Sequence, residues 1–149
     1  MALSPAPTGS YLRGMKAYLF PLVALALPVA ASAQSATQFA GTWRNGGDSV
    51  RIRVAPCGPG LCGTVVAASD KAKADAAAGG TDRLVGTQLF RDFRRGPDGQ
   101  WAGTVYVPDL GTEVEGTLGL NGANTLVATG CLFGGLGCKS QSWTRVSAK

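Results

Sequence analysis

The sequence contains no histidine. Histidine is the usual proton acceptor beside a catalytic serine or cysteine, and the commonest metal ligand. Its absence removes the ordinary Ser-His and Cys-His nucleophiles and the mixed Cys/His zinc sites. We therefore expect no enzyme activity, and no catalytic, cofactor-binding or metal site.

Two pairs of polar residues remain as candidates for chemistry. Glu113 and Glu115 share the polar face of one predicted strand, where carboxylates two positions apart are usually solvated. Ser140 and Ser142 alternate on another predicted strand with no candidate base nearby in sequence. Neither pair predicts catalysis.

The chain also lacks a concentrated basic stripe. It has 14 Lys and Arg against 9 Asp and Glu, a net charge of +5, and loss of Arg13 and Lys16 with a leader would lower this to +3. The one basic cluster, residues 91–95, lies beside a predicted hairpin turn, where charges are usually solvated. We expect no nucleic-acid partner.

Residues 1–33 have the features of a signal peptide. Basic residues precede an apolar run at 17–30, and small residues at Ala31 and Ala33 predict cleavage after Ala33. Met15 gives a more typical start than Met1. The run is shorter than the ~20 residues of a membrane helix, and no cysteine follows it before Cys57. We expect a periplasmic or secreted monomer without a membrane span.

The four cysteines, Cys57, Cys62, Cys131 and Cys138, all follow the predicted leader. An even number in an exported chain predicts disulfides, and four cysteines allow three pairings. The local pairs Cys57–Cys62 and Cys131–Cys138 are favoured because each brackets a glycine-containing turn. The alternative, a four-thiolate zinc site, lacks the usual C-x₂-C spacing.

The remaining 116 residues predict one all-β domain, 34–149. Short alternating runs such as Val50, Ile52 and Val54 are separated by turns such as Asn121-Gly122. Residues 69–81 interrupt the pattern and predict a loop or a short surface helix. The predicted strands are 39–44, 49–54, 61–68, 83–93, 101–107, 112–120, 125–133 and 139–146.

About eight antiparallel strands of this length predict an up-and-down, lipocalin-like barrel; a β-sandwich is the alternative. The first and last strands should meet. Trp43 lies in the first strand, and we expect it to contact Gln141, Trp143 and Arg145, which share one face of the last strand. These residues predict barrel closure or a ligand contact. Tyr106 shares its strand with the apolar Trp101 but faces the other way, which predicts a contact at the rim.

The order of short motifs resembles the bacterial domain-of-unknown-function family numbered 2147. The resemblance runs from Gly41 to Arg145 and implies a small exported protein without an established activity. Its motifs are Gly41-x-Trp43, Cys57…Leu61-Cys62-Gly63, Gly103…Tyr106-x-Pro108…Gly111 and Gly130-Cys131…Gln141-x-Trp143-x-Arg145.

The chain is more loosely similar to lipocalin-like barrels, in which an early Gly-x-Trp packs beside an arginine of the last strand. That similarity implies that Arg145 stacks on Trp43 and closes one end of the barrel. Two functions remain open. One is a binding module for a small apolar or amphipathic ligand. The other is a structural protein with a filled barrel that contacts an envelope component through an exposed apolar patch.

Overall fold

The computed structural model describes residues 26–27, 34–132 and 136–147. The predicted leader, its cleavage after Ala33 and the start at Met15 lie outside these residues, apart from positions 26–27. Residues 32–149 form one compact unit, to which all the elements below belong.

Eight antiparallel strands form a closed barrel in chain order, each paired with its sequence neighbours, and the last paired with the first. The barrel prediction is confirmed, and the β-sandwich alternative is wrong because the sheet closes on itself. The elements are α1 (Ala36–Phe39), β1 (Gly41–Asn45), β2 (Val50–Cys57), β3 (Gly60–Ala68), α2 (Asp70–Ala78), β4 (Gln88–Arg95), β5 (Trp101–Val107), β6 (Thr112–Leu120), β7 (Thr125–Leu132) and β8 (Leu136–Arg145).

The alternation in the sequence sets which side chains enter the barrel. On β2, Ile52 and Val54 are buried, whereas Arg53 between them is exposed. The Asn121-Gly122 turn joins β6 to β7 with Gly122 at a φ of 74°, a conformation that glycine adopts without strain. Strand periodicity and turn chemistry therefore agree along the chain.

Strand β2 continues to Cys57 and β8 begins at Leu136, each three residues beyond the predicted bound. Two further segments that the sequence assigns to strands lie outside them. Phe39 ends the short helix α1, in which the Ser35 N–H donates to Gln38 Oε1 at 2.7 Å. Residues 83–87 form a turn before β4, because Thr87 N–H bonds to Leu84 O and Gly86 has a φ of 94°. Local hydrogen bonds thus shape both segments, and Gly86 and Thr87 keep two backbone hydrogen bonds to Val65 of β3.

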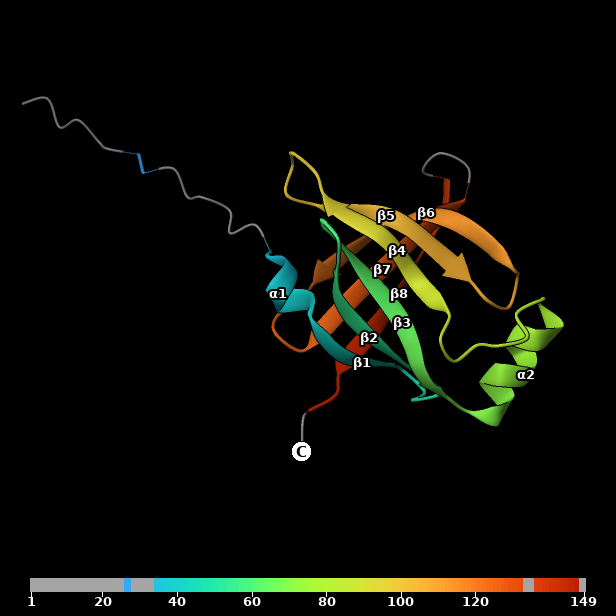
Figure 1. Cartoon of the computed structure of the whole chain (residues 1–149). Coiled ribbons are helices and arrows are strands. Elements are labelled where there is room, and N and C mark those ends of the chain that lie inside the picture. Colours follow the sequence, from blue (N-terminus) through green and yellow to red (C-terminus); the bar gives the residue numbers. More distant parts are fainter. Residues whose placement is uncertain (1–25, 28–33, 133–135, 148–149) are drawn as a thin grey trace, which may run out of the picture. The chain divides into compact units, whose positions relative to one another are not determined.

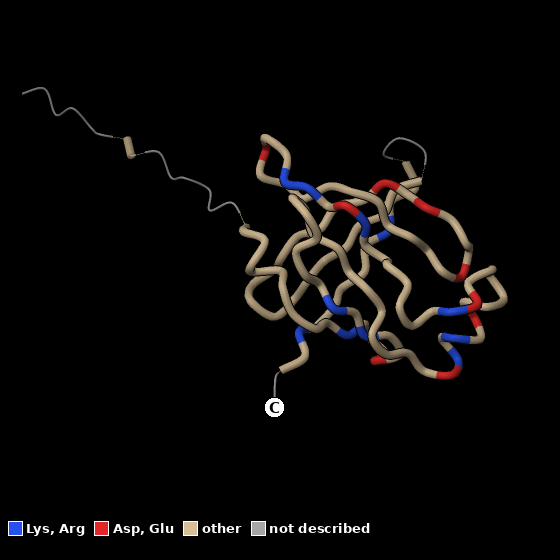
Figure 2. Tube along the Cα trace, in the orientation of Figure 1, with Lys and Arg blue, Asp and Glu red and all other residues tan. Residues whose placement is uncertain are grey.

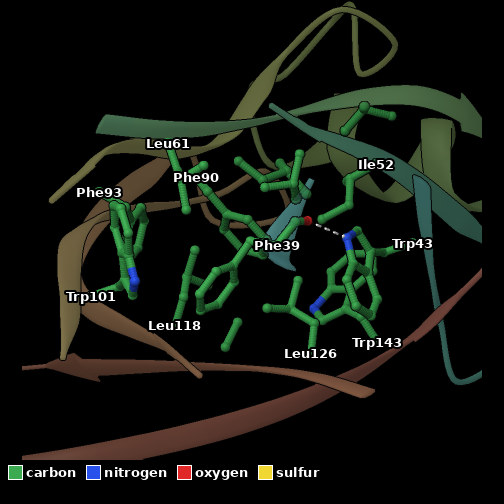
Figure 3. Packing of buried hydrophobic residues seen from close by; sticks show 14 of the residues in the cluster. Phe39, Trp43, Ile52, Leu61, Phe90, Phe93, Trp101, Leu118, Leu126 and Trp143 are labelled. Carbon is green, nitrogen blue, oxygen red and sulfur yellow. Dashed lines mark hydrogen bonds between the residues drawn. The ribbon is translucent and has the colours of Figure 1, made fainter. Parts of the chain in front are cut away.

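Large aromatic side chains fill one end of the barrel, which α1 covers (Figures 1 and 3). Trp43 is fully buried and its indole N–H donates to Phe39 O at 2.9 Å, the dashed line of Figure 3. The Phe39 and Trp101 rings meet edge to face, with centroids 5.7 Å apart. We call this end of the barrel the floor.

Arg145 joins the first and last strands at the floor. Its guanidinium carbon lies 4.1 Å from the centre of the Trp43 ring. Its three nitrogens donate to the main-chain oxygens of Gln38, Ala40 and Ala123 at 2.6–2.9 Å. One side chain thus satisfies three carbonyls that have no strand partner at the barrel end.

Gln34, the residue after the predicted cleavage point, also belongs to the floor. Its side-chain amide makes two hydrogen bonds with the backbone of Leu120, as a neighbouring strand would. Its carbonyl accepts the indole N–H of Trp101 at 2.9 Å. The first residues of the domain are therefore fixed by β5 and β6.

Replacing Trp43 with alanine should lower the free energy of unfolding by about 3–5 kcal/mol, because a fully buried ring is removed. Urea denaturation monitored by circular dichroism measures this loss. Arg44→Ala, on the outer face of the same strand, is the control and should change stability by less than about 0.5 kcal/mol. Equal losses in both variants would show that the seam does not depend on the Trp43 ring.

Candidate functional site

The end of the barrel opposite the floor encloses a cavity of about 850 Å³. The two helices lie at opposite ends of the barrel in Figure 1, and residues of α2 line the mouth of the cavity. Ligand pockets in proteins commonly measure about 300–1,000 Å³. The cavity is therefore large enough for a small organic ligand.

Small residues on two neighbouring strands leave this space open. Ala128 and Gly130 on β7 face Gln141 and Lys139 on β8, and Gly137 lies further along β8. At the floor, the corresponding inward position of β7 is Leu126, paired with Trp143. The change from large to small side chains along the β7–β8 hairpin makes one end dense and the other hollow.

The cavity wall formed by β4, β5, β6 and the turn at residues 83–87 before β4 is apolar. Leu84, Leu89 and Phe90 are buried, whereas the valines are only partly covered. The side chains of this wall are Leu84, Leu89, Phe90, Val105, Val107 and Val114. Such a surface favours a hydrocarbon group over water.

The wall formed by β8 carries hydrogen-bond donors. Lys139, Gln141 and Trp143 occupy alternate positions of the strand and all line the cavity. Gln141 and Trp143 thus share one face, as the sequence predicts, and Lys139, which the sequence pattern does not single out, lies on the same face. The Trp143 side chain is 3% exposed, and its indole N–H has no hydrogen-bond acceptor in the described part of the chain.

Other polar side chains at the cavity are already engaged in the fold. Asn45 accepts the backbone N–H groups of Ser49 and Val50 and donates to the Ser49 hydroxyl. The Ser69 hydroxyl accepts the N–H of Ala72 and caps α2. These groups therefore hold turns and helix ends in place.

Tyr106 lies at the mouth and fixes the segment that follows α2. Thr81 donates its single hydroxyl hydrogen to Pro108 O at 2.9 Å, so the Tyr106 hydroxyl donates to Thr81 at 2.7 Å. Arg91 stacks on the Tyr106 ring at 4.5 Å and pairs with Glu113. Tyr106, predicted as a rim contact, is thus engaged by Thr81 and Arg91 of the fold.

Helix α2 is held against the turn between β5 and β6. A Cβ atom on Gly79 would lie 2.1 Å from the carbonyl oxygen of Asp109, so only glycine allows this approach. Lysines and aspartates are interspersed along α2 (Figure 2). Asp75 bonds to Lys71 at 2.6 Å and raises the pKa of that ammonium, with a smaller contribution from Asp109.

The predicted closure residues therefore divide between the two ends of the barrel. Trp43 and Arg145 close the floor, whereas Gln141 and Trp143 line the cavity. Trp143 links the two regions, because its ring packs edge to face on Phe90 with centroids 6.0 Å apart. The residues expected to act together thus have two separate structural roles.

Two disulfides join neighbouring strands. Cys57–Cys62 links β2 to β3, and Cys131–Cys138 links β7 to β8, as the local pairing predicts. Disulfides fit a protein that folds in an oxidising compartment. Across residues 26–27, 34–132 and 136–147, there is no helix long and apolar enough to cross a membrane. The same residues contain no metal-binding cluster of three or more cysteine or carboxylate side chains.

A family described as an uncharacterized protein conserved in bacteria, DUF2147, matches residues 41–145. The chain belongs to the DUF2147 family. The matched range begins at the Gly41 end of β1 and ends at Arg145, so the DUF2147 domain is the barrel itself. A search of curated proteins found no match.

Among solved structures, this DUF2147 barrel is similar to protein HP1028 from Helicobacter pylori, which is described as belonging to the lipocalin family. The TM-score is 0.56 at 13% sequence identity, over 73% of this chain and 83% of HP1028. The similarity shows a lipocalin-like fold.

Changing Tyr106 to phenylalanine should loosen α2, because the hydroxyl bond to Thr81 is lost. We expect the free energy of unfolding to fall by about 0.5–1.5 kcal/mol. Amide hydrogen exchange should become faster in α2, whereas exchange in the barrel strands should change little. Thr129→Val removes a comparable hydroxyl pair, that with Ser140 on β8, and is the control. Unchanged α2 exchange in the Tyr106 variant would contradict a fixing role for this residue.

Proposed function

We propose that this protein is exported to the periplasm and binds a small apolar or amphipathic molecule in the barrel cavity without converting it chemically. The cavity of about 850 Å³ is the observation that carries the proposal. An eight-stranded barrel either fills its interior with side chains or holds one small ligand. Side chains fill the floor of this barrel, whereas its open end has room for a small ligand.

The apolar wall supplies the driving force for binding. Burial of apolar surface contributes about 25 cal/mol per Å² removed from water, so a chain of several methylene groups gains several kcal/mol before the entropic cost of association. The ligand would contact Leu89, Phe90 and Val105, which the adjacent strands β4 and β5 hold in place. A largely preformed site keeps the ordering cost low.

The lipocalin-like fold shared with HP1028 supports the same proposal, and the two disulfides support export. The alternative, a structural envelope protein, predicts a filled barrel. The open cavity favours binding over that alternative.

Binding of a neutral hydrophobic dye such as N-phenyl-1-naphthylamine tests the proposal. The oxidised protein should enhance dye fluorescence with a 1:1 stoichiometry. Ala128→Phe places a ring in the cavity and should abolish the enhancement. Ala102→Phe adds the same ring at an exposed position of β5 and is the matched control.

Both variants should melt within a few degrees of the unmodified protein, so that loss of binding is not loss of fold. The proposal is wrong if the unmodified protein gives no enhancement, or if Ala128→Phe binds the dye as well as Ala102→Phe does.

A further inference from the structure

We propose that the ligand is an anionic amphiphile, with a head group that contacts Lys139 and Gln141 and a hydrocarbon chain that lies against the β4–β6 wall. This inference rests on the proposed function and adds the chemical class of the ligand. Lys139 carries the argument, because it is a cation on the cavity side of the barrel.

The position of Lys139 follows from the register of the last hairpin. Lys139 pairs with Gly130 and lies four positions before the buried Trp143, so strand alternation places both side chains on the inner face. Opposite a glycine, the lysine has no large neighbour across the strands. Within the described ranges, Lys139 makes no ion pair or side-chain hydrogen bond.

Gln141 extends this row of donors toward the buried Trp143. Alternate residues of a strand are about 6.8 Å apart, so a head group beside Gln141 is within reach of the long Lys139 side chain. The Gln141 amide likewise has no hydrogen-bond partner in the part of the chain that the structure describes. The indole N–H of Trp143 lies deeper, is buried, and has no acceptor among residues 34–132 and 136–147.

The remaining charged groups at the cavity lie on the α2 side of the mouth. Lys71 is paired with Asp75, and Asp109 lies at the turn that α2 contacts. The acidic groups therefore share one nearby cation, whereas Lys139 stands on β8 without a carboxylate partner among the described residues. This distribution gives the β8 wall a positive charge that an anionic head group would neutralise.

The two walls together define an amphiphile rather than a simple hydrocarbon. The β8 wall presents an ammonium and an amide, both of which donate, whereas the indole N–H of Trp143 is buried behind this surface. The opposite wall presents mainly hydrocarbon side chains, among them Leu89, Phe90 and Val105, and the Tyr106 hydroxyl at its mouth is already bonded to Thr81. A carboxylate or a phosphate monoester accepts from several donors at once, whereas an alcohol accepts weakly and a quaternary ammonium does not accept.

Three ligands with the same alkyl chain test the head group. Dodecanoate, dodecanol and dodecyltrimethylammonium are each titrated, below their micellar concentrations, against the oxidised protein carrying the neutral dye. Dodecanoate should displace the dye with an affinity about five- to tenfold higher than dodecanol, and dodecyltrimethylammonium should bind most weakly. Dodecyl phosphate, as a fourth ligand, distinguishes a phosphate from a carboxylate head group.

Lys139→Met retains a long side chain and removes its charge, and should abolish the preference for dodecanoate over dodecanol. Lys73→Met, on the outer side of α2, is the matched control and should keep it. Dye binding by both variants shows that the cavity is intact.

The outcomes separate this inference from the proposed function. Equal affinities for the three head groups, tighter binding of the cationic one, or an unchanged preference in Lys139→Met would overturn the anionic class while leaving a binding module in place. Failure of the dye and of every amphiphile to bind would refute the binding module itself.

Discussion

The barrel depends on one arginine. Arg145 stacks on Trp43 and donates to three main-chain oxygens, from the segment before β1 and from the β6–β7 turn. These carbonyls lie where strands end, so the sheet provides them with no partners. A guanidinium supplies several donors in a fixed plane, and no other side chain can satisfy three acceptors while its face covers an indole. The closed sheet is thus sealed by a single planar cation.

Sealing the floor allows the other end to be hollow. Trp43, Phe39 and Trp101 give the floor a dense aromatic core, which stabilises the closed sheet without help from the open end. Ala128 and Gly130 leave space at the open end, where these small residues contribute little packing. The β7–β8 hairpin that carries them is held together there by the Cys131–Cys138 disulfide. The protein combines a rigid base with a preformed cavity in a domain of modest size.

Most of the fold follows from sequence patterns, whereas the site does so only in part. Period-two alternation and turn residues predict the strands, and the spacing of Trp43 and Arg145 predicts the seam. Phe39 misleads, because a large apolar residue before a strand resembles part of it, although it ends α1 and covers the floor. The sequence pattern does not single out Lys139 as a residue of the cavity. A lysine on a strand normally faces solvent, and only its register opposite Gly130 places it at the cavity.

The pairing of β1 with β8 also bears on how the barrel folds. Each other strand pair joins neighbours along the chain, mostly hairpins with short loops, whereas Arg145 and Ala40 are 105 residues apart. Closing so long a loop costs entropy before any contact compensates for it, and such non-local contacts slow folding. The hairpins can therefore form early as an open, curved sheet with two unpaired edges. Closure of the last pair removes these edges and, with them, the route to aggregation through strand addition.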